Sequence, residues 1–118
     1  MRAKNINELI VYKLSMDFSM LIFKATLKFP TSEKYSLSDQ LRRASRSVSA
    51  NIAEGWGMRD YPKLFKKHLT YAMGSLEETK CWIDYSERCN YINEDESISF
   101  LRSSEEIGAK LYLLRKSI

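Results

Sequence analysis

Glycine, proline, cysteine and histidine are scarce in this chain of 118 residues, which contains 4 glycines, 2 prolines, 2 cysteines and 1 histidine. So few glycines and prolines leave little material for the many turns of a β-sandwich or barrel. The stretches rich in Leu, Lys, Glu, Ala and Met instead favour helices. The sequence therefore predicts an all-α protein, and its length fits one domain, residues 1–118.

Long apolar runs are also missing. No segment approaches the roughly 18 apolar residues of a membrane-spanning helix, and the N-terminus lacks the pattern of a signal peptide. We therefore expect a cytoplasmic protein without membrane contact. Cys81 and Cys89 lie on one predicted helix, about 12 Å apart along its axis, which is too far for a disulfide. With His68 as the one histidine, no zinc pattern exists, and we expect no metal and no cofactor.

The net charge of +4 is unevenly distributed. Residues 40–67 contain seven basic and two acidic side chains, whereas residues 68–118 contain six basic and nine acidic ones. This asymmetry indicates an anionic partner for the middle segment, or a neighbouring subunit that pairs basic with acidic halves.

Capping residues and breaks divide the chain into four predicted helices. A polar residue followed three positions later by an acidic one is typical of a helix start, and proline forbids helix continuation except in the first turn. By these signals the first helix extends from Asn5 to about Lys28, and the second from Ser36 to the Gly55-Trp56-Gly57 break. The third extends from Asp60 to about Cys89, and the fourth from Asn93 to the end of the chain. Four amphipathic helices of this length predict a four-helix bundle.

Each predicted helix has a stripe of apolar residues at helical spacing, which we assign to the core. The four stripes are Ile10, Leu14, Phe18, Leu21, Ile22 and Ala25; Leu37, Leu41, Ala44, Val48 and Ile52; Phe65, Leu69, Ala72, Leu76, Thr79 and Ile83; and Ile98, Leu101, Ile107, Leu111 and Leu114.

The first and third helices carry a second apolar stripe. Because a four-helix bundle buries one stripe per helix, we expect the second to contact another subunit of an oligomer; scattered surface aromatics are the alternative. The glycine in this set allows a close backbone approach. The predicted interface comprises Leu9, Tyr12, Met16, Met20, Phe23, Leu27, Leu64, Tyr71, Gly74, Trp82 and Tyr85.

A group of basic residues is predicted on the side of the second helix opposite its core stripe, and it continues into the third helix. Guanidinium and ammonium groups bind phosphates without reading base sequence, so the group fits a nucleic-acid surface, and it equally fits a solvated helix face. For the neighbouring Trp56 and Tyr61, packing is favoured over stacking on bases. The candidate nucleic-acid-binding residues are Arg42, Arg43, Arg46, Arg59, Lys63, Lys66 and Lys67.

Catalytic constellations are not evident. Asn51 and Glu54 lack a nucleophile, and polar groups at the edge of a helical core usually bond to neighbouring backbone or helices. Ser75 lies two helical turns from His68, too far for a catalytic pair. We therefore expect no enzymatic activity and a structural role for Asn51 and Glu54.

An ordered series of short blocks resembles one family, the four-helix bundle proteins encoded in intervening sequences of bacterial 23S rRNA genes. The resemblance extends from about Leu9 to Leu114. It implies an up-and-down antiparallel four-helix bundle that assembles into a homopentameric ring, and a fold similar to the accessory variability proteins of retroelements. It also implies a structural role for Gln40 and Gly55 in the motif. The blocks are Lys28-Phe29-Pro30, Glu33, Tyr35, Leu37, Gln40-Leu41-Arg42-Arg43-Ala44, Asn51-Ile52-Ala53-Glu54-Gly55-Trp56 and Ala72-Met73-Gly74-Ser75-Leu76-Glu77-Glu78.

Two functions follow as hypotheses. The first is a non-enzymatic oligomer that binds nucleic acid, with structured RNA favoured, and whose binding weakens strongly with salt. The second is a protein-interaction scaffold or an accessory subunit of a nucleic-acid enzyme such as a reverse transcriptase. In that case the basic group pairs with acidic residues such as Glu94, Asp95, Glu105 and Glu106.

Overall fold

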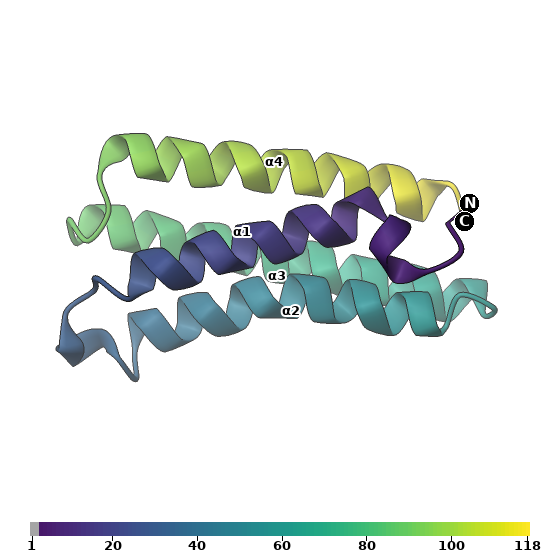
Figure 1. Ribbon diagram of the computed structural model, residues 1–118, viewed down its shortest axis with the longest axis horizontal. Coiled ribbons are helices and arrows are strands. Elements are labelled where there is room, and N and C mark those ends of the chain that lie inside the picture. The colour runs from purple at the N-terminus through teal and green to yellow at the C-terminus, as the bar shows by residue number, and fades with distance from the viewer. Residues whose placement is uncertain (1–2) are drawn as a thin grey trace.

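The computed structural model describes residues 3–118, which form four long helices side by side (Figure 1). They are α1 (Ile10–Thr26), α2 (Leu37–Gly57), α3 (Pro62–Arg88) and α4 (Glu94–Lys116); the short 3₁₀ helices η1 (Ile6–Glu8) and η2 (Thr31–Glu33) precede α1 and α2. Consecutive helices run in opposite directions, so η1, the α2–α3 connection and the end of α4 lie at the same end of the bundle (Figure 1). The predicted up-and-down four-helix bundle is confirmed.

The predicted helix starts are correct for α4 and nearly so for α2 and α3. Asn93 and Glu96 form a complete capping box, in which each side chain accepts a hydrogen bond from the other residue's backbone N–H. Ser36 is the residue before α2, but the side chain that accepts from the first N–H of that helix belongs to Glu33. α3 begins with Pro62 after Tyr61 rather than at a cap by Asp60, because a proline in the first position has no N–H to satisfy.

The predicted start of the first helix at Asn5 is wrong. Asn5 Oδ1 does accept a hydrogen bond, from the Asn7 N–H at 3.0 Å, but this bond closes only the three-residue η1. The chain then becomes extended at Leu9, whose side chain is buried in the core. α1 therefore begins at Ile10, because burial of Leu9 requires a backbone conformation that a helix does not have.

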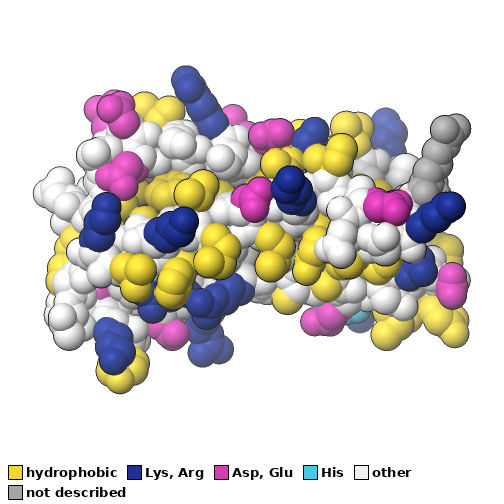
Figure 2. All heavy atoms as spheres, viewed as in Figure 1, with side chains coloured by type: hydrophobic (Ala, Val, Ile, Leu, Met, Phe, Trp, Pro, Cys, Tyr) yellow, Lys and Arg dark blue, Asp and Glu magenta, His cyan; other side chains and the backbone are white. Residues whose placement is uncertain are grey.

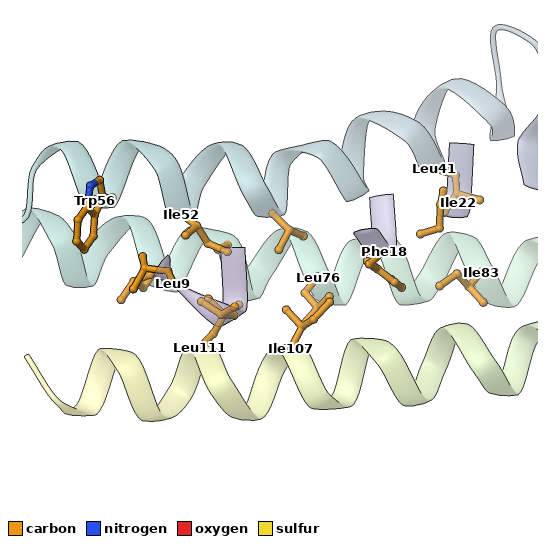
Figure 3. Packing of buried hydrophobic residues seen from close by; sticks show 14 of the residues in the cluster. Leu9, Phe18, Ile22, Leu41, Ile52, Trp56, Leu76, Ile83, Ile107 and Leu111 are labelled. Atoms are coloured by element: carbon orange, nitrogen blue, oxygen red, sulfur yellow. The ribbon is translucent and has the colours of Figure 1, made fainter. Parts of the chain in front are cut away.

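The core residues predicted for α2 and α3 are all buried. Figure 3 shows part of this core: Trp56 and Leu9 lie near the end with the α2–α3 connection, Leu76 and Ile107 near the middle, and Ile83 with Ile22 toward the other end. The strict 3.6-residue periodicity of these two helices explains the agreement, since one narrow face contains every apolar position.

The core assignment for α1 is partly wrong. Phe18 and Ile22 are buried as predicted, but Ile10 and Leu21 are 68% and 54% exposed. The buried face of α1 instead includes the small polar residues Ser15, Ser19 and Thr26, with Val11. The same error occurs once in α4, where Ile98 is exposed.

Hydroxyl groups explain how serine and threonine occupy the core. Ser15 and Thr26 donate hydrogen bonds to carbonyl oxygens three residues earlier in α1, at 2.7 and 2.8 Å. The Ser19 and Ser45 hydroxyls lie 3.2 Å apart across the α1–α2 contact. Because these groups are satisfied and small, the helices pack closely without an apolar side chain at each position.

The helices α2 and α3 approach each other closely at Gly55. A Cβ atom built on Gly55 would lie 3.1 Å from both His68 Cβ and Phe65 Cδ1. Gly55 is therefore required for the spacing of this pair, which makes the most extensive helix contact in the bundle. The geometry supports the structural role predicted for Gly55.

A side-chain contact joins the two connections at the opposite end of the bundle. The Tyr91 hydroxyl donates a hydrogen bond to Glu33 Oε2 at 2.9 Å, and the ring of Tyr91 packs against Phe29. This hydrogen bond, assisted by the Leu37 N–H, holds the pKa of Glu33 below its usual range. It also raises the pKa of the Tyr91 phenol.

Candidate nucleic-acid interface

The seven basic residues predicted as one nucleic-acid surface lie in two places. Arg42, Arg43 and Arg46 are in the first half of α2, whereas Arg59 follows the end of that helix. Arg42 and Arg59 are separated by about 25 Å along the helix axis. The lysines of α3 lie with Arg59, because α3 begins where α2 ends.

The three arginines of α2 are partly engaged within the chain. Arg42 Nε donates a hydrogen bond to Thr26 Oγ1 at 2.7 Å, and its guanidinium lies 4.8 Å from the centre of the Phe23 ring. Arg46 lies 5.7 Å from the same ring, and Arg43 approaches Asp39 at 4.0 Å. The expectation that all three point to the side away from the other helices is therefore wrong for Arg42, which lies against α1.

Six basic side chains gather at the end of the bundle that contains the α2–α3 connection. At 100° per residue, Lys63, Lys66 and Lys67 lie on the outward side of α3, opposite the buried Phe65 and Leu69. The last turn of α4 adds two more residues, which the sequence analysis missed. We call this group the basic patch; its members are Arg59, Lys63, Lys66, Lys67, Arg115 and Lys116.

Contacts between α4 and α3 place Arg115 and Lys116 in the basic patch. Arg115 Nη1 donates a hydrogen bond to Thr70 Oγ1 at 3.0 Å. Lys66, Tyr112, Arg115 and Lys116 line an open hollow between the two helices. The signal in the sequence was the basic last turn of α4, and it becomes informative only once the antiparallel arrangement places this turn beside the start of α3.

The basic patch contains little compensating charge. Between residues 59 and 72 and between 108 and 118, Asp60 is the one acidic side chain. Within the described residues 3–118, ion pairs join Arg43 to Asp39, His68 to Glu54 and Lys80 to Glu77, and none involves the basic patch. Unpaired like charges at this density create a strongly positive potential, which favours binding of a polyanion.

Two aromatic residues near the basic patch were predicted to pack. Trp56 is 7% exposed and lies in the core, as predicted, with the Arg59 guanidinium 4.3 Å from its ring. Tyr61, in contrast, is 63% exposed, so the packing role assigned to it is wrong.

A second surface feature is an exposed apolar row on α1. Met16, Met20, Phe23 and Leu27 share one side of the helix, and Leu27 is 63% exposed; we call these four residues the α1 surface. In Figure 2 yellow side chains follow α1, and dark blue side chains gather below them over α2. Leu9, predicted for the same interface, is buried in the core and does not belong to this surface.

The predicted interface residues of α3 are also open to solvent in part. Leu64, Tyr71 and Tyr85 are exposed, and Trp82 is half-buried, with its indole N–H donating to Glu78 Oε2 at 3.0 Å. Within residues 3–118, no atom beyond Gly74's own neighbouring backbone lies within 4 Å of a Cβ built on Gly74. On α1, Tyr12 is half-buried against the core.

The polar residues predicted to be structural form a group between α2 and α3. Asn51 Nδ2 donates to the Ser47 carbonyl at 2.9 Å, and His68 Nδ1 lies 3.5 Å from Asn51 Oδ1 and 3.6 Å from Glu54 Oε2. The Ser75 hydroxyl is bonded to Ser47 at 2.9 Å, so it does not meet the histidine. These contacts support structural roles for Asn51 and Glu54.

Gln40 differs from the other motif residues. It is exposed on α2, and its side chain forms no hydrogen bond within residues 3–118. The structural role implied for Gln40 therefore finds no support in contacts within this chain.

The fold and the basic patch define an up-and-down four-helix bundle protein with a strongly basic end. The sequence pattern of the family described as 23S rRNA-intervening sequence protein matches residues 7–113. The chain belongs to this family. Among curated proteins, none matches the chain.

A solved structure supports the same grouping. It is the crystal structure of a protein of unknown function from the S23 ribosomal protein family of Bacteroides thetaiotaomicron. The two chains are 26% identical, and the match has a TM-score of 0.82 and covers 91% of this chain and 96% of the other. None of the helices within residues 3–118 has the length and apolar character needed to cross a membrane.

Proposed function

We propose that this protein binds nucleic acid through the basic patch and has no catalytic role. The observation that carries the proposal is the group of six basic side chains, contributed by the α2–α3 connection, α3 and α4, without an ion pair inside the described chain. A phosphate backbone offers the repeated negative charges that such a group needs. Because the family is described by its link to 23S rRNA, RNA is the first ligand to test.

Binding of this kind has a defined salt dependence. Each cation that neutralises a phosphate releases a counterion, so the affinity falls as the salt concentration rises. If all six side chains contact a single strand, log K falls with log salt with a slope of about −4. Because no base edge is read in such contacts, the affinity should depend little on base sequence.

The test is a charge-reversal variant, Lys63→Glu with Lys66→Glu and Lys67→Glu. The matched control reverses three exposed lysines, Lys13 and Lys24 of α1 and Lys28 just after its end, and so changes the net charge equally. Binding of labelled rRNA fragments is measured by fluorescence anisotropy over a range of salt concentrations, with the oligomeric state of each variant checked by ultracentrifugation.

The patch variant should bind more weakly, and its salt slope should become shallower by about 2 because three phosphate contacts are lost. The control should lose less affinity at each salt concentration and keep the slope. No affinity for RNA at low salt, or equal losses in the two triple variants, would contradict the proposal. A separate Arg43→Glu variant measures what the arginines of α2 add to binding.

We further infer that the chain self-associates through the α1 surface. Arginine, methionine and aromatic side chains are enriched at protein interfaces. Here Arg42 and Arg46 lie over the half-buried Phe23, whose neighbours in the row, Met20 and Leu27, are exposed. An apolar row of this length on a monomer would face water without compensation. The family resemblance makes a ring of five subunits the expected assembly.

Self-association is tested with Met20→Glu, using Leu113→Glu as the control, since Leu113 is an equally accessible apolar residue on α4 outside the predicted interface. In sedimentation velocity experiments the first variant should dissociate and the second should not. A wild-type monomer at micromolar concentration would contradict self-association. In that case the α1 surface is left for a different protein, as in a scaffold or an accessory subunit of a nucleic-acid enzyme.

A further inference from the structure

Two tyrosine rings lie among the charges of the basic patch. Tyr71 on α3 is 49% exposed and Tyr112 on α4 is 48% exposed. Within residues 3–118 neither hydroxyl forms a hydrogen bond. About half of each ring is therefore exposed to water, where aromatic surface is unfavourable.

Each ring is next to a cation. Lys67 Nζ lies 5.7 Å from the centre of the Tyr71 ring, and the Arg115 guanidinium lies 5.9 Å from the centre of the Tyr112 ring. His68 contacts Tyr71 edge-on, with ring centres 6.0 Å apart, and so restricts the rotation of this ring. The arrangement repeats a pair of groups, an aromatic ring and a positive charge, on two neighbouring helices.

The two pairs lie at the same level of the bundle, on α3 and α4. Arg115, which lies over Tyr112, donates its hydrogen bond to Thr70, and Thr70 immediately precedes Tyr71 in α3. Lys66 lines the hollow that separates Tyr112 from α3. A ligand in this region would contact positive charges and ring surfaces together.

Unpaired nucleotides have the complementary chemistry. Each one offers a negatively charged phosphate and a base whose flat face is free to stack on an aromatic ring, whereas the bases of a duplex are stacked on each other. A duplex would contact only the lysines and arginines of the basic patch, through its phosphates. We infer that the basic patch selects single-stranded RNA or unpaired loops over duplexes, with Tyr71 and Tyr112 as stacking residues; this inference rests on the proposed nucleic-acid function.

The inference sharpens the expectation of structured RNA as the ligand. In a folded RNA, the loops and bulges would bind to the basic patch, and the paired stems would contribute only phosphate contacts. The selectivity should be one of strandedness rather than of sequence, since stacking tolerates every base.

The experiment compares two RNA ligands with similar numbers of phosphates, an unstructured 24-nucleotide single strand and a blunt duplex of 12 base pairs, by fluorescence anisotropy. The variant is Tyr71→Leu with Tyr112→Leu, which keeps apolar bulk and charge. The control is Tyr35→Leu with Tyr85→Leu. Both control residues are exposed, and Tyr35 also lies near a lysine, with Lys34 Nζ 5.4 Å from its ring.

The wild type should bind the single strand more tightly than the duplex. The Tyr71/Tyr112 variant should lose at least about tenfold in affinity for the single strand, given the usual effect of removing aromatic stacking partners, and less than about twofold for the duplex. The control variant should match the wild type with both ligands.

Three outcomes would overturn the inference: a wild type that prefers the duplex, a tyrosine variant that binds the single strand as well as the wild type does, or equal losses for both ligands. If the lysine reversal abolishes binding while the tyrosine variant changes neither affinity, nucleic-acid binding stands and strand selection fails. If neither RNA ligand binds to the wild type at low salt, both proposals fail. If a polyglutamate chain binds as tightly as the single strand, the basic patch is a general polyanion site and the stacking role is wrong.

Discussion

The substitution Gly55→Ala tests whether α2 and α3 pack as closely at this position as the structure indicates. The added Cβ would lie 3.1 Å from His68 Cβ and Phe65 Cδ1, and 3.4 Å from the Phe65 carbonyl oxygen. Phe65 is 1% exposed and is held by the core on its other sides. The new methyl group therefore forces the helices apart or displaces a buried ring.

Two opposing terms set the magnitude. Alanine in place of glycine within a helix stabilises it by about 1 kcal/mol, because the unfolded chain loses less freedom. Overpacking of a filled site costs about 1–3 kcal/mol. The unfavourable term is larger here, because one of the two atoms at 3.1 Å is the Cβ of His68, which is fixed to the α3 backbone, and the other belongs to a buried ring. We therefore expect a net loss of about 1 kcal/mol.

The matched control is Gly74→Ala, in the middle of the exposed side of α3. In the described part of the chain, no atom outside the adjacent backbone of α3 lies within 4 Å of the new Cβ, so only the favourable term of about 1 kcal/mol applies. For a chain of this length that amount corresponds to a rise in Tm of about 4 °C. The Gly55 variant should show a fall of similar size.

Both variants are measured by thermal and urea unfolding, followed by circular dichroism at several protein concentrations, because the stability of an oligomer depends on its concentration. If Gly55→Ala stabilised the protein as much as Gly74→Ala, the argument for close helix packing would be wrong. A Gly74 variant that is more stable at low concentration but forms weaker oligomers would place Gly74 in the subunit interface.

Three further predictions concern the ends of the helices and the core. Because the Tyr91 hydroxyl lowers the pKa of Glu33, this pair stabilises the fold above the unfolded pKa of glutamate, and the stabilisation is lost as the pH falls below about 4. Tyr91→Phe should weaken this acid dependence in urea unfolding at a series of pH values; an unchanged profile would contradict the assignment. Asn93→Ala removes half of the capping box of α4 and should lower the free energy of unfolding by about 1 kcal/mol in urea unfolding. Ser97 Oγ is buried and has no hydrogen-bond partner within residues 3–118, so Ser97→Ala should raise the stability by about 1 kcal/mol, and a loss would show that the hydroxyl is satisfied in solution.

The two surface features have different consequences for the proposed oligomer. The α1 surface, with Arg42 and Arg46 beside it, has the composition of a protein contact, and the basic patch has that of a polyanion site. Since the patch lies at one end of the bundle and the arginines about 25 Å away along α2, association through α1 leaves the patch open. In a ring, several basic patches would then face the same side, and a long RNA would contact more than one of them.

The helices of this protein follow from local features of the sequence. The capping box at Asn93, the proline at position 62 and the regular spacing of Leu37, Leu41, Val48 and Ile52 act within one or two turns, so their effects do not depend on the rest of the fold. The short blocks that resemble the family are also local features of the sequence, and the family match over residues 7–113 confirms the resemblance.

The buried face of α1 could not be read in the same way. Ser15, Ser19 and Thr26 are polar by composition but buried in the fold, because their hydroxyls bond to carbonyls of their own helix or to Ser45 across the contact. Leu9 likewise turns into the core from outside the helix. A hydrophobicity pattern has no means of recognising satisfied polar groups, and it therefore placed the core stripe on Ile10 and Leu21, which are exposed.

The sequence by itself determined that this chain is helical, where the three helices after the first begin and end to within a few residues, and that its middle segment is basic. The tertiary structure decided how those charges are grouped. Antiparallel packing places Lys66 of α3 beside Arg115 of α4, 49 positions later in the chain, and separates both from Arg42. Distances through space between such residues depend on the arrangement of whole helices, which is why the order of the amino acids indicated the basic residues from 59 to 67 but not their grouping with Arg115, Lys116 and Tyr112.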